Sequence, residues 1–428
     1  QERMLVVARK GKEDEVKAIC KKWDLHSEII GKVTRGATLS VHHNGRKVAS
    51  IPAESLVLGG GAPVYHREDK KPAYIDQLHS FDLRVLPEPD ACDDVLIKLL
   101  SSPNIASKEW VTRQYDHMVR TNTVVLPGSD AAVIRIKGTR RALAMKTDCN
   151  GRYVYLNPRV GAKIAVAESA RNVVCSGGQP VAITNCLNFG NPYKPEIFWQ
   201  FKEAVAGIGE ACLALNTPVT GGNVSFYNEN PEGAVYPTPV IGMIGIVEDL
   251  RHVTTAWFKA VGDLVVLLGK NRDEIGGSEY LKVQFGRVAG DCPRLDLNFE
   301  KRLQSACLEA IREGSVQSAH DVAEGGLAVA LAESCFLNPH QKLGAVIKLH
   351  PEERMDFTLF GEDQSRIVIS VKESNLKRMQ EICERNDIPL TVLGRVEGDS
   401  LVVNDVIDLS IEKLFDTYYN AIRRKMES

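Results

Sequence analysis

Two stretches of the chain repeat one order of hydrophobic and polar positions at a constant offset of 363 residues. Residues 1–33 align without a gap to residues 364–396, and the apolar positions of the two stretches coincide. In both copies the pattern predicts a strand, a helix and a second strand, which in the first copy cover residues 4–8, 12–23 and 28–33. Self-similarity at so long a period indicates duplicated domains rather than a short structural repeat.

The first copy lacks the front that the second copy has. In the second copy the residues from about 110 onward precede the repeated stretch, whereas nothing of comparable length precedes residue 1. The chain also begins with Gln rather than Met. We therefore expect it to be the C-terminal portion of a longer polypeptide, with any chemistry of the missing N-terminal half absent.

The rest of the chain alternates short apolar runs with amphipathic stretches, which is typical of an α/β or α+β fold. Asn44-Gly45 predicts a tight hairpin turn, and a polar, glycine-rich stretch at 59–72 indicates a domain boundary. Further strands are predicted at 131–136, 141–146, 181–184, 240–247 and 264–268, and further helices at 325–335 and 376–385.

Charge and cysteine content exclude some classes of function. The 53 basic and 55 acidic residues provide no basic surface, so we expect no nucleic-acid partner. Ten cysteines without a C-x-x-C pair favour free thiols in a reducing cytoplasm. No run of about eighteen apolar residues occurs, so we expect no membrane span and a cytoplasmic location.

Asp148 and Asn150 directly follow a predicted strand. Side-chain oxygens placed at a strand end can hold a hard cation such as Mg²⁺. The sequence Asp-x-Asn-Gly is also common in turns, so a turn without a ligand is the alternative.

Two further polar stretches follow predicted strands and are expected to be loops. The first, residues 184–192, crowds three amides, including Asn185, and amides both donate and accept hydrogen bonds. In the second, residues 220–225, paired glycines allow a phosphate to approach the backbone, while Asn223 and Ser225 add a metal ligand and a hydroxyl. Because sites of α/β domains gather at strand ends, these stretches predict a nucleotide site.

His320 lies in a stretch that leads into a predicted helix. Capping and a favourable carboxylate–dipole contact are the ordinary explanation for its acidic neighbours. Catalysis by His320 is the alternative, since histidine is the commonest general acid or base.

Taken together, these strings resemble one family, phosphoribosylformylglycinamidine synthase, specifically the synthetase subunit of the small, multi-subunit type. The resemblance covers essentially the whole chain and is carried by QERM (1–4), LGGGAP (58–63), SDAAV (129–133), DCNGRYVY (148–155), LNFGNP (187–192), KPEIFWQ (194–200), TGGNVSFY (220–227), HDVAEGGLA (320–328) and GEDQSR (361–366).

The resemblance implies an α/β (α+β) fold with N- and C-terminal domains like those of aminoimidazole ribonucleotide synthetase, duplicated in the parent protein. On this basis residues 1–75 are the end of the C-terminal-type domain of the first half, and 76–104 form a linker. Residues 105–255 are the N-terminal-type nucleotide-binding domain of the second half. Residues 256–428 are its C-terminal-type domain.

The family converts formylglycinamide ribonucleotide, ATP and ammonia to the amidine, ADP and phosphate in purine biosynthesis. The resemblance thus implies ATP and Mg²⁺ as cofactors. It also implies three protein partners: a glutaminase subunit that supplies ammonia, a small accessory subunit, and the missing N-terminal half. The family's catalytic histidines lie upstream of Gln1, so we expect no catalytic residue here and no turnover by this chain alone.

The family's pattern assigns roles to five residues. Asn185 and Gly222 contact ATP, Asn223 is a magnesium ligand, and Ser225 and Gln1 contact the substrate. Many relatives carry Asp at the position of Asn185, so a neutral amide there suits a nucleotide better than a cation. Asp148 and Asn150 remain further candidates from their own spacing.

Two other hypotheses stay open. This half can be a non-catalytic scaffold that completes the active site across a pseudo-twofold interface and holds a structural nucleotide. The chain can also be a relative with the same fold, such as aminoimidazole ribonucleotide synthetase or selenophosphate synthetase. The long duplication and the strings LNFGNP and TGGNVSFY argue against this last hypothesis.

Overall fold

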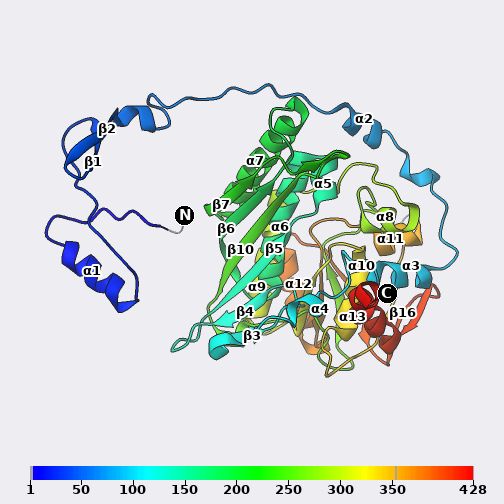
Figure 1. The fold of residues 1–428 in the computed structure, drawn as a ribbon. Coiled ribbons are helices and arrows are strands. Elements are labelled where there is room, and N and C mark those ends of the chain that lie inside the picture. The colour runs from blue at the N-terminus through cyan, green and yellow to red at the C-terminus, as the bar shows by residue number, and fades with distance from the viewer. Residues whose placement is uncertain (1–2, 352–353, 428) are drawn as a thin grey trace. The chain divides into compact units, whose positions relative to one another are not determined.

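The computed structural model describes residues 3–351 and 354–427 and divides the chain into two compact units (Figure 1). Unit 1 is Gln1–His66 and unit 2 is Arg67–Ser428. Among the described residues no helix is both long and apolar enough to cross a membrane.

Unit 1 contains one helix, one hairpin and a short 3-10 turn among its described residues. The helix α1 (Glu13–Lys22) lies where the hydrophobic pattern predicted it. The hairpin joins β1 (Thr38–His43) to β2 (Arg46–Pro52) through Asn44 and Gly45, whose φ angles of 49° and 75° are those of a tight hairpin turn. The 3-10 turn is η1 (Ala53–Leu56).

The strands predicted at 4–8 and 28–33 do not form, so this part of the prediction was wrong. Their counterparts in the second copy, β14 (Ile367–Val371) and β15 (Leu390–Val396), both pair with β11 (Leu264–Leu268). No counterpart of β11 exists in the described part of unit 1. A strand needs a partner for its backbone N–H and C=O groups, so the same local pattern yields strands in only one copy.

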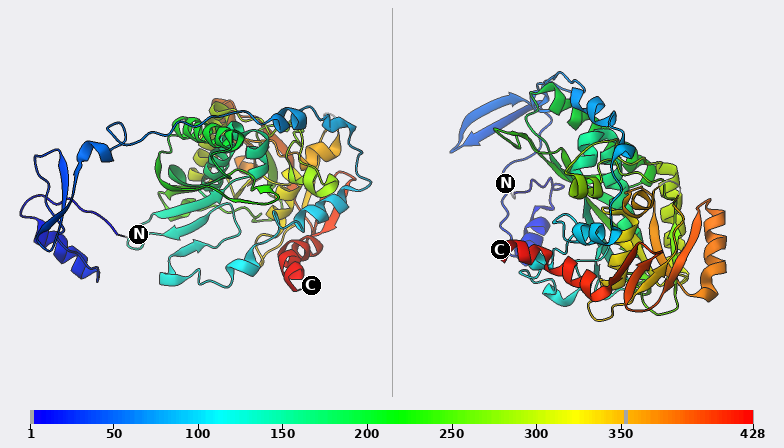
Figure 2. Two further views of the ribbon diagram at one scale, coloured as in Figure 1. Left: turned by 45° about the horizontal axis from the view of Figure 1, so that its top comes forward. Right: turned by 90° about the vertical axis from the view of Figure 1, so that its right-hand side faces the viewer.

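The first sheet of unit 2 has six strands and is covered on one face by two helices (Figures 1 and 2). The long helix α6 contacts β5, β10 and β6, and α7 packs against α6. The strands, in sheet order, are β3 (Thr123–Val125), β4 (Ala132–Arg135), β5 (Ala142–Asp148), β10 (Thr238–Val247), β6 (Gln179–Asn188) and β7 (Val219–Ser225), and the helices are α5 (Gly151–Leu156), α6 (Pro158–Cys175) and α7 (Pro195–Leu215).

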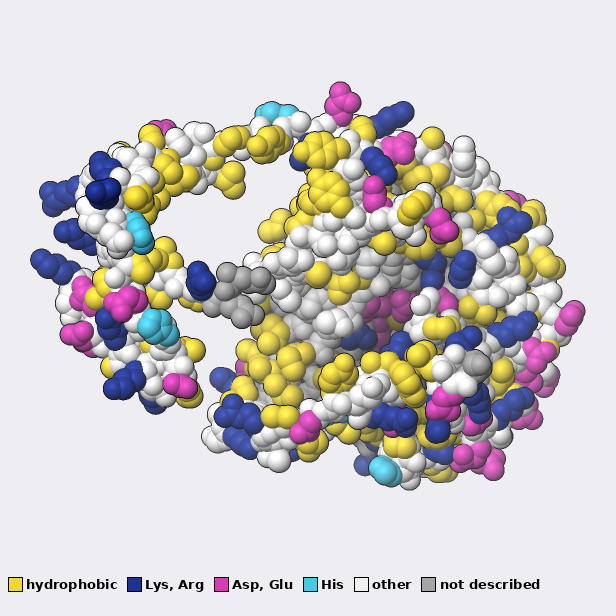
Figure 3. All heavy atoms as spheres, viewed as in Figure 1, with side chains coloured by type: hydrophobic (Ala, Val, Ile, Leu, Met, Phe, Trp, Pro, Cys, Tyr) yellow, Lys and Arg dark blue, Asp and Glu magenta, His cyan; other side chains and the backbone are white. Residues whose placement is uncertain are grey.

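Burial alternates along β10, because helices cover one face of this sheet and leave the other face open. Ile241, Met243 and Val247 are buried toward the helices, whereas Ile244 and Ile246 are only half-buried. Figure 3 shows hydrophobic side chains gathered over the part of the sheet near β3 and β4. Only β6 and β7 run parallel, and all other pairs are antiparallel.

The second sheet has seven strands and lies between layers of helices. Its central strands β11 and β14 are buried along their whole length. In sheet order the strands are β12 (Ser318–Asp321), β14, β11, β15, β13 (Ala345–Ile347), β16 (Ser400–Val403) and β17 (Ile407–Ser410). The helices are α8 (Glu279–Phe285), α9 (Leu297–Arg312), α10 (Gly326–Phe336), α11 (Met355–Phe360), α12 (Leu376–Arg385) and α13 (Ile411–Glu427).

The segment 76–104, expected to be a linker, carries α3 (Cys92–Leu100) and the end of α2 (Ala73–His79). Leu96, Leu99 and Leu100 of α3 have no exposed surface and join the same hydrophobic core as α8 and α10. This segment is therefore part of the packed body of unit 2. Unit 2 also contains the short elements α4 (Glu109–Thr112), β8 (Glu229–Asn230) and β9 (Gly233–Ala234) and four 3-10 helices, η2 (Leu83–Val85), η3 (Val119–Thr121), η4 (Leu250–His252) and η5 (Glu373–Asn375).

Candidate functional site

Four residues on neighbouring strands form one row across the first sheet. Asp148 of β5 pairs with Ile241 of β10, Ile241 pairs with Asn185 of β6, and Asn185 pairs with Gly222 of β7. Directly paired residues project to the same face of a sheet, and Ile241 is fully buried. The side chains of Asp148 and Asn185 therefore lie on the face that the helices cover.

The polar stretches 184–188 and 220–225 belong to β6 and β7, so the expectation of two loops was wrong. Their parallel pairing satisfies backbone groups that a loop would leave to water. Asn and Gly are unfavourable in strands, yet tertiary pairing overrides that preference here. The pairing brings Asn185, Gly222, Asn223 and Ser225 onto two adjacent strands.

Gly222 makes room for the Asn185 carboxamide. A Cβ atom at position 222 would lie 2.1 Å from Asn185 Oδ1 and 2.9 Å from the Asn185 backbone oxygen. A Cβ at the neighbouring Gly221 would have no atom within 4 Å. Only the second glycine of the pair is thus required by the packing.

Asn223 and Ser225 face the other side of the sheet. They pair with Cys186 and Asn188, and Asn223 Nδ2 lies 3.8 Å from Cys186 Sγ. The Ser225 hydroxyl lies 3.3 Å from Asn228 Oδ1. The sequence-predicted residues are therefore close in the sheet but divided between its two faces, and Gln1 lies outside the described residues.

Asn223 can supply one of the oxygen ligands that Mg²⁺ needs. Its amide N–H group is directed at Cys186, which leaves Oδ1 as a possible oxygen ligand. In the described part of the chain no three His, Cys, Asp or Glu side chains are grouped to hold a metal ion. Mg²⁺ often binds through one or two protein oxygens with phosphates and waters, so Asn223 fits a nucleotide-bound cation rather than a protein cage.

Asp148 and Asn150 lie at the end of β5, as predicted, but in different environments. Asp148 Oδ2 is buried and accepts no hydrogen bond from the described residues, and burial raises the pKa of this carboxyl to about 7 despite nearby Lys146. Asn150 caps α5 by accepting from the Arg152 N–H at 3.1 Å, and its Nδ2 donates to Glu324 at 3.2 Å. Its contacts are those of a helix cap.

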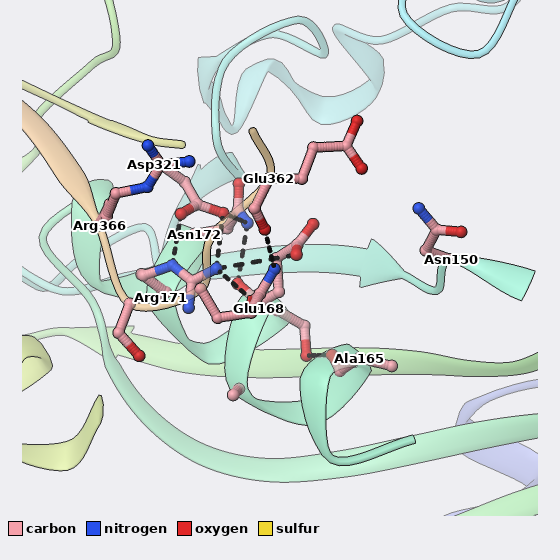
Figure 4. Close-up of polar contacts among 12 residues, drawn as sticks. Asn150, Ala165, Glu168, Arg171, Asn172, Asp321, Glu362 and Arg366 are labelled. Carbon is pink, nitrogen blue, oxygen red and sulfur yellow. Dashed lines mark hydrogen bonds and ion pairs between the residues drawn. The ribbon is translucent and has the colours of Figure 1, made fainter. Parts of the chain in front are cut away.

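A buried charge cluster centred on Arg171 lies behind this row (Figure 4). Arg171 of α6 has no exposed surface and pairs with Asp321 of β12 and with Glu300 of α9, the latter at 2.9 Å. Glu168 lies 3.7 Å away, and burial raises its pKa well above the ordinary value. The cluster ties the helix under the first sheet to the second sheet. Figure 3 shows acidic and basic side chains at the bottom of a hollow in unit 2.

Sequence reasoning missed this cluster, although a signal existed. Helix α6 is almost entirely buried, and Glu168, Arg171 and Asn172 interrupt its apolar sequence. Charged side chains in a buried helix require partners, because an unpaired buried charge is costly.

His320 is a buried cation that links β12 to the segment before β4 and to α10. It lies in β12, and its ring nitrogens contact Asp130 at 3.0 Å and Glu333 at 2.9 Å. Burial alone would lower the pKa of His320, but the two carboxylates outweigh it and raise the pKa to about 10. The expectation that the acidic neighbours of His320 cap the following helix was wrong, since Gly325 precedes α10 without a side-chain cap. At neutral pH the imidazolium stays charged and holds its partners.

Two family models match the chain. The model described as AIR synthase related protein, N-terminal domain, matches residues 128–247. The model described as AIR synthase related protein, C-terminal domain, matches residues 1–44 and 260–405. The second model thus covers both copies of the repeated pattern.

The chain is also similar to curated proteins along its whole length. It is 50% identical to the phosphoribosylformylglycinamidine synthase subunit PurL of Alkaliphilus metalliredigens, over 100% of this chain and 58% of that protein. It is 50% identical to the subunit of the same name from Moorella thermoacetica, over 97% of this chain and 56% of that protein. The chain therefore spans somewhat more than half the length of these relatives.

Solved structures agree on the fold. Thermotoga maritima PurL complexed with FGAR superposes with a TM-score of 0.60 at 18% identity, covering 77% of this chain and 54% of that chain. The same protein complexed with ATP gives a TM-score of 0.57 at 20% identity, covering 75% of this chain and 51% of that chain.

Proposed function

The chain belongs to the AIR synthase related family and is similar over its whole length to PurL subunits, and on this premise we propose that it forms the C-terminal part of an ATP-dependent C–N ligase. The reaction is the conversion of formylglycinamide ribonucleotide to formylglycinamidine ribonucleotide in cytoplasmic purine biosynthesis. Ammonia comes from a glutaminase subunit, and a small accessory subunit and an N-terminal half complete the assembly.

The reaction needs bound and positioned substrates, but it needs no nucleophile from this chain. The substrate amide oxygen attacks the γ-phosphorus of ATP and ADP leaves. Ammonia then adds to the activated carbon, and phosphate departs with that oxygen. Catalysis of such transfers rests on positioned phosphates and charge neutralisation.

In this proposal the residues of the β6–β7 pair have three tasks. Asn185 and its pairing partner Gly222 contact ATP. Asn223 supplies one oxygen to Mg²⁺, which neutralises phosphate charge when bound, and Ser225 contacts the substrate. Gln1, which belongs to the first half, contacts the substrate. Asp148 and Asn150 are further candidates to hold a cation. The single observation that supports these roles most directly is the parallel pairing of β6 and β7.

One observation favours the alternative of a scaffold half with a structural nucleotide. Neither β6 nor β7 contains His, Asp, Glu, Lys or Arg. Apart from the Cys186 thiol, their polar groups are amides, hydroxyls and backbone groups, which can bind ligands but are not efficient general acids or bases near neutral pH. Both proposals therefore expect binding without turnover by this chain.

Isothermal titration of the purified chain with ATP–Mg²⁺ and, separately, with formylglycinamide ribonucleotide tests the proposal, together with an ammonia-dependent activity assay. We expect binding and no amidine formation. Turnover by this chain would refute the assignment of catalysis to the other half. Absence of binding to both ligands would refute the proposed roles of β6 and β7.

A further inference from the structure

Tyr227 has a backbone conformation that a bulky residue rarely adopts. Its φ angle is 61°, in the left-handed region that Gly and Asn tolerate and large side chains avoid. It lies two residues after Ser225, in the connection from β7 to β8. Strain of this kind persists only where the surrounding structure enforces it.

Several hydrogen bonds enforce this turn. The Tyr227 N–H donates to the Gly190 carbonyl at 3.1 Å, and the Asn228 N–H donates to the Phe189 carbonyl at 3.1 Å. The Asn228 side-chain Nδ2 also donates to the Ser225 carbonyl at 2.8 Å. The turn is therefore fixed against the two residues that follow β6 and against Ser225, the proposed substrate contact.

The Tyr227 ring itself is not used for packing. The residue is 56% exposed, and its phenol makes no hydrogen bond or ring contact with any residue in 3–351 or 354–427. Its neighbour Phe226, in contrast, packs edge-on against Phe201 with 5.0 Å between ring centroids. Asn at position 227 would keep every backbone bond of the turn without the strain.

We propose that Tyr227 is a substrate-positioning residue whose ring covers the ribonucleotide held at Ser225. This inference rests on the proposed function. The turn fixes the backbone of Tyr227 two residues after Ser225, and an exposed aromatic face offers a large contact area at low entropic cost. The backbone strain is retained because the side chain contributes to binding rather than to folding.

The test compares three variants of the whole chain: Tyr227→Asn, Tyr227→Phe and, as a matched control, Tyr115→Asn. Tyr115 is 71% exposed and precedes β3, at the opposite edge of the sheet from β7. Thermal unfolding measures the strain, and isothermal titration with formylglycinamide ribonucleotide measures binding.

We expect Tyr227→Asn to raise Tm by about 2 °C and to weaken binding about tenfold. Tyr227→Phe keeps the ring and the strain, so Tm should be unchanged and affinity should stay within about twofold. Tyr115→Asn should alter neither. A lower Tm for Tyr227→Asn, or unchanged affinity while the unaltered chain binds, would overturn this inference alone. No binding by the unaltered chain would overturn both the inference and the proposed substrate contact.

Discussion

Replacing Gly222 by Ala tests whether Asn185 binds the nucleotide. The new Cβ would lie 2.1 Å from Asn185 Oδ1, whereas real Cβ contacts are essentially never shorter than 3.0 Å. The carboxamide must therefore move by about 1 Å, the difference between these distances. The contact with the Asn185 backbone oxygen, at 2.9 Å, needs only a slight adjustment. The strand pairing should survive while the amide loses its position.

The expected effect is on binding rather than on folding. Loss of one hydrogen bond to a nucleotide weakens binding by about 1–2 kcal/mol, or roughly fivefold to thirtyfold in Kd for ATP–Mg²⁺. The free energy of unfolding should change by less than about 1 kcal/mol, since Ala also restricts the unfolded chain. Gly221→Ala is the control, because its Cβ meets no atom within 4 Å.

A double-mutant cycle with Asn185→Ala identifies the route of the effect. If Gly222→Ala acts by displacing this amide, it should add almost nothing once Asn185 is removed. Titration with ATP–Mg²⁺ and chemical denaturation measure the two quantities. Full affinity in Asn185→Ala would refute the assignment of Asn185, and full affinity in Gly222→Ala or additive losses in the double variant would refute displacement of its amide as the route.

Three other predictions follow from the described contacts. His320→Gln should remove part of the pH dependence of stability: the folded-state pKa of about 10 exceeds the ordinary value of 6.5, so the stabilisation is complete below pH 6.5 and is lost as pH rises toward 10. The stabilisation that His320 contributes should fall by up to about 1.4 kcal/mol per pH unit across that range. Denaturation of the unaltered chain and of His320→Gln at several pH values measures this. Equal slopes of unfolding free energy against pH in the two proteins would contradict the prediction. Arg171→Met leaves the carboxylates of Asp321 and Glu300 without their cation and should cost about 3–5 kcal/mol of unfolding free energy, whereas a change below 1 kcal/mol would show that the cluster is not needed for stability. Finally, alkylation of the half-buried Cys186, which lies beside Asn223, should slow when ATP–Mg²⁺ or formylglycinamide ribonucleotide is added. Equal alkylation rates with and without these ligands would show that they bind elsewhere.

Part of the arrangement of the candidate site was predictable from the sequence. Asp148 and Asn150 were correctly placed at a strand end. Asn185 and Gly222 were assigned to separate loops, although they are paired residues of β6 and β7. Sequence spacing cannot reveal that pairing, because 37 residues separate the two positions and the partner of a strand is chosen by the whole sheet.

The buried charge cluster of Arg171 was likewise only partly predictable from the sequence. The amino-acid order alone indicates that helix α6 is apolar with a few charged interruptions. It does not indicate that Arg171 meets Asp321 and Glu300, which lie on a strand and a helix of the other sheet. Burial of a charge depends on partners far along the chain.

By itself the sequence determined the repeated unit, the hairpin turn at Asn44-Gly45 and the family, together with the helices α1, α10 and α12 and the strands β4, β5, β6, β10 and β11. These features depend on local spacing and on backbone angles that particular residues favour. Only the tertiary structure decided that the repeated pattern forms strands in one copy and not in the other, which polar residues share a face, and which charges are buried. The two copies make the reason plain: residues 4–8 and 367–371 share one pattern, but only the latter have a neighbouring strand to accept their hydrogen bonds.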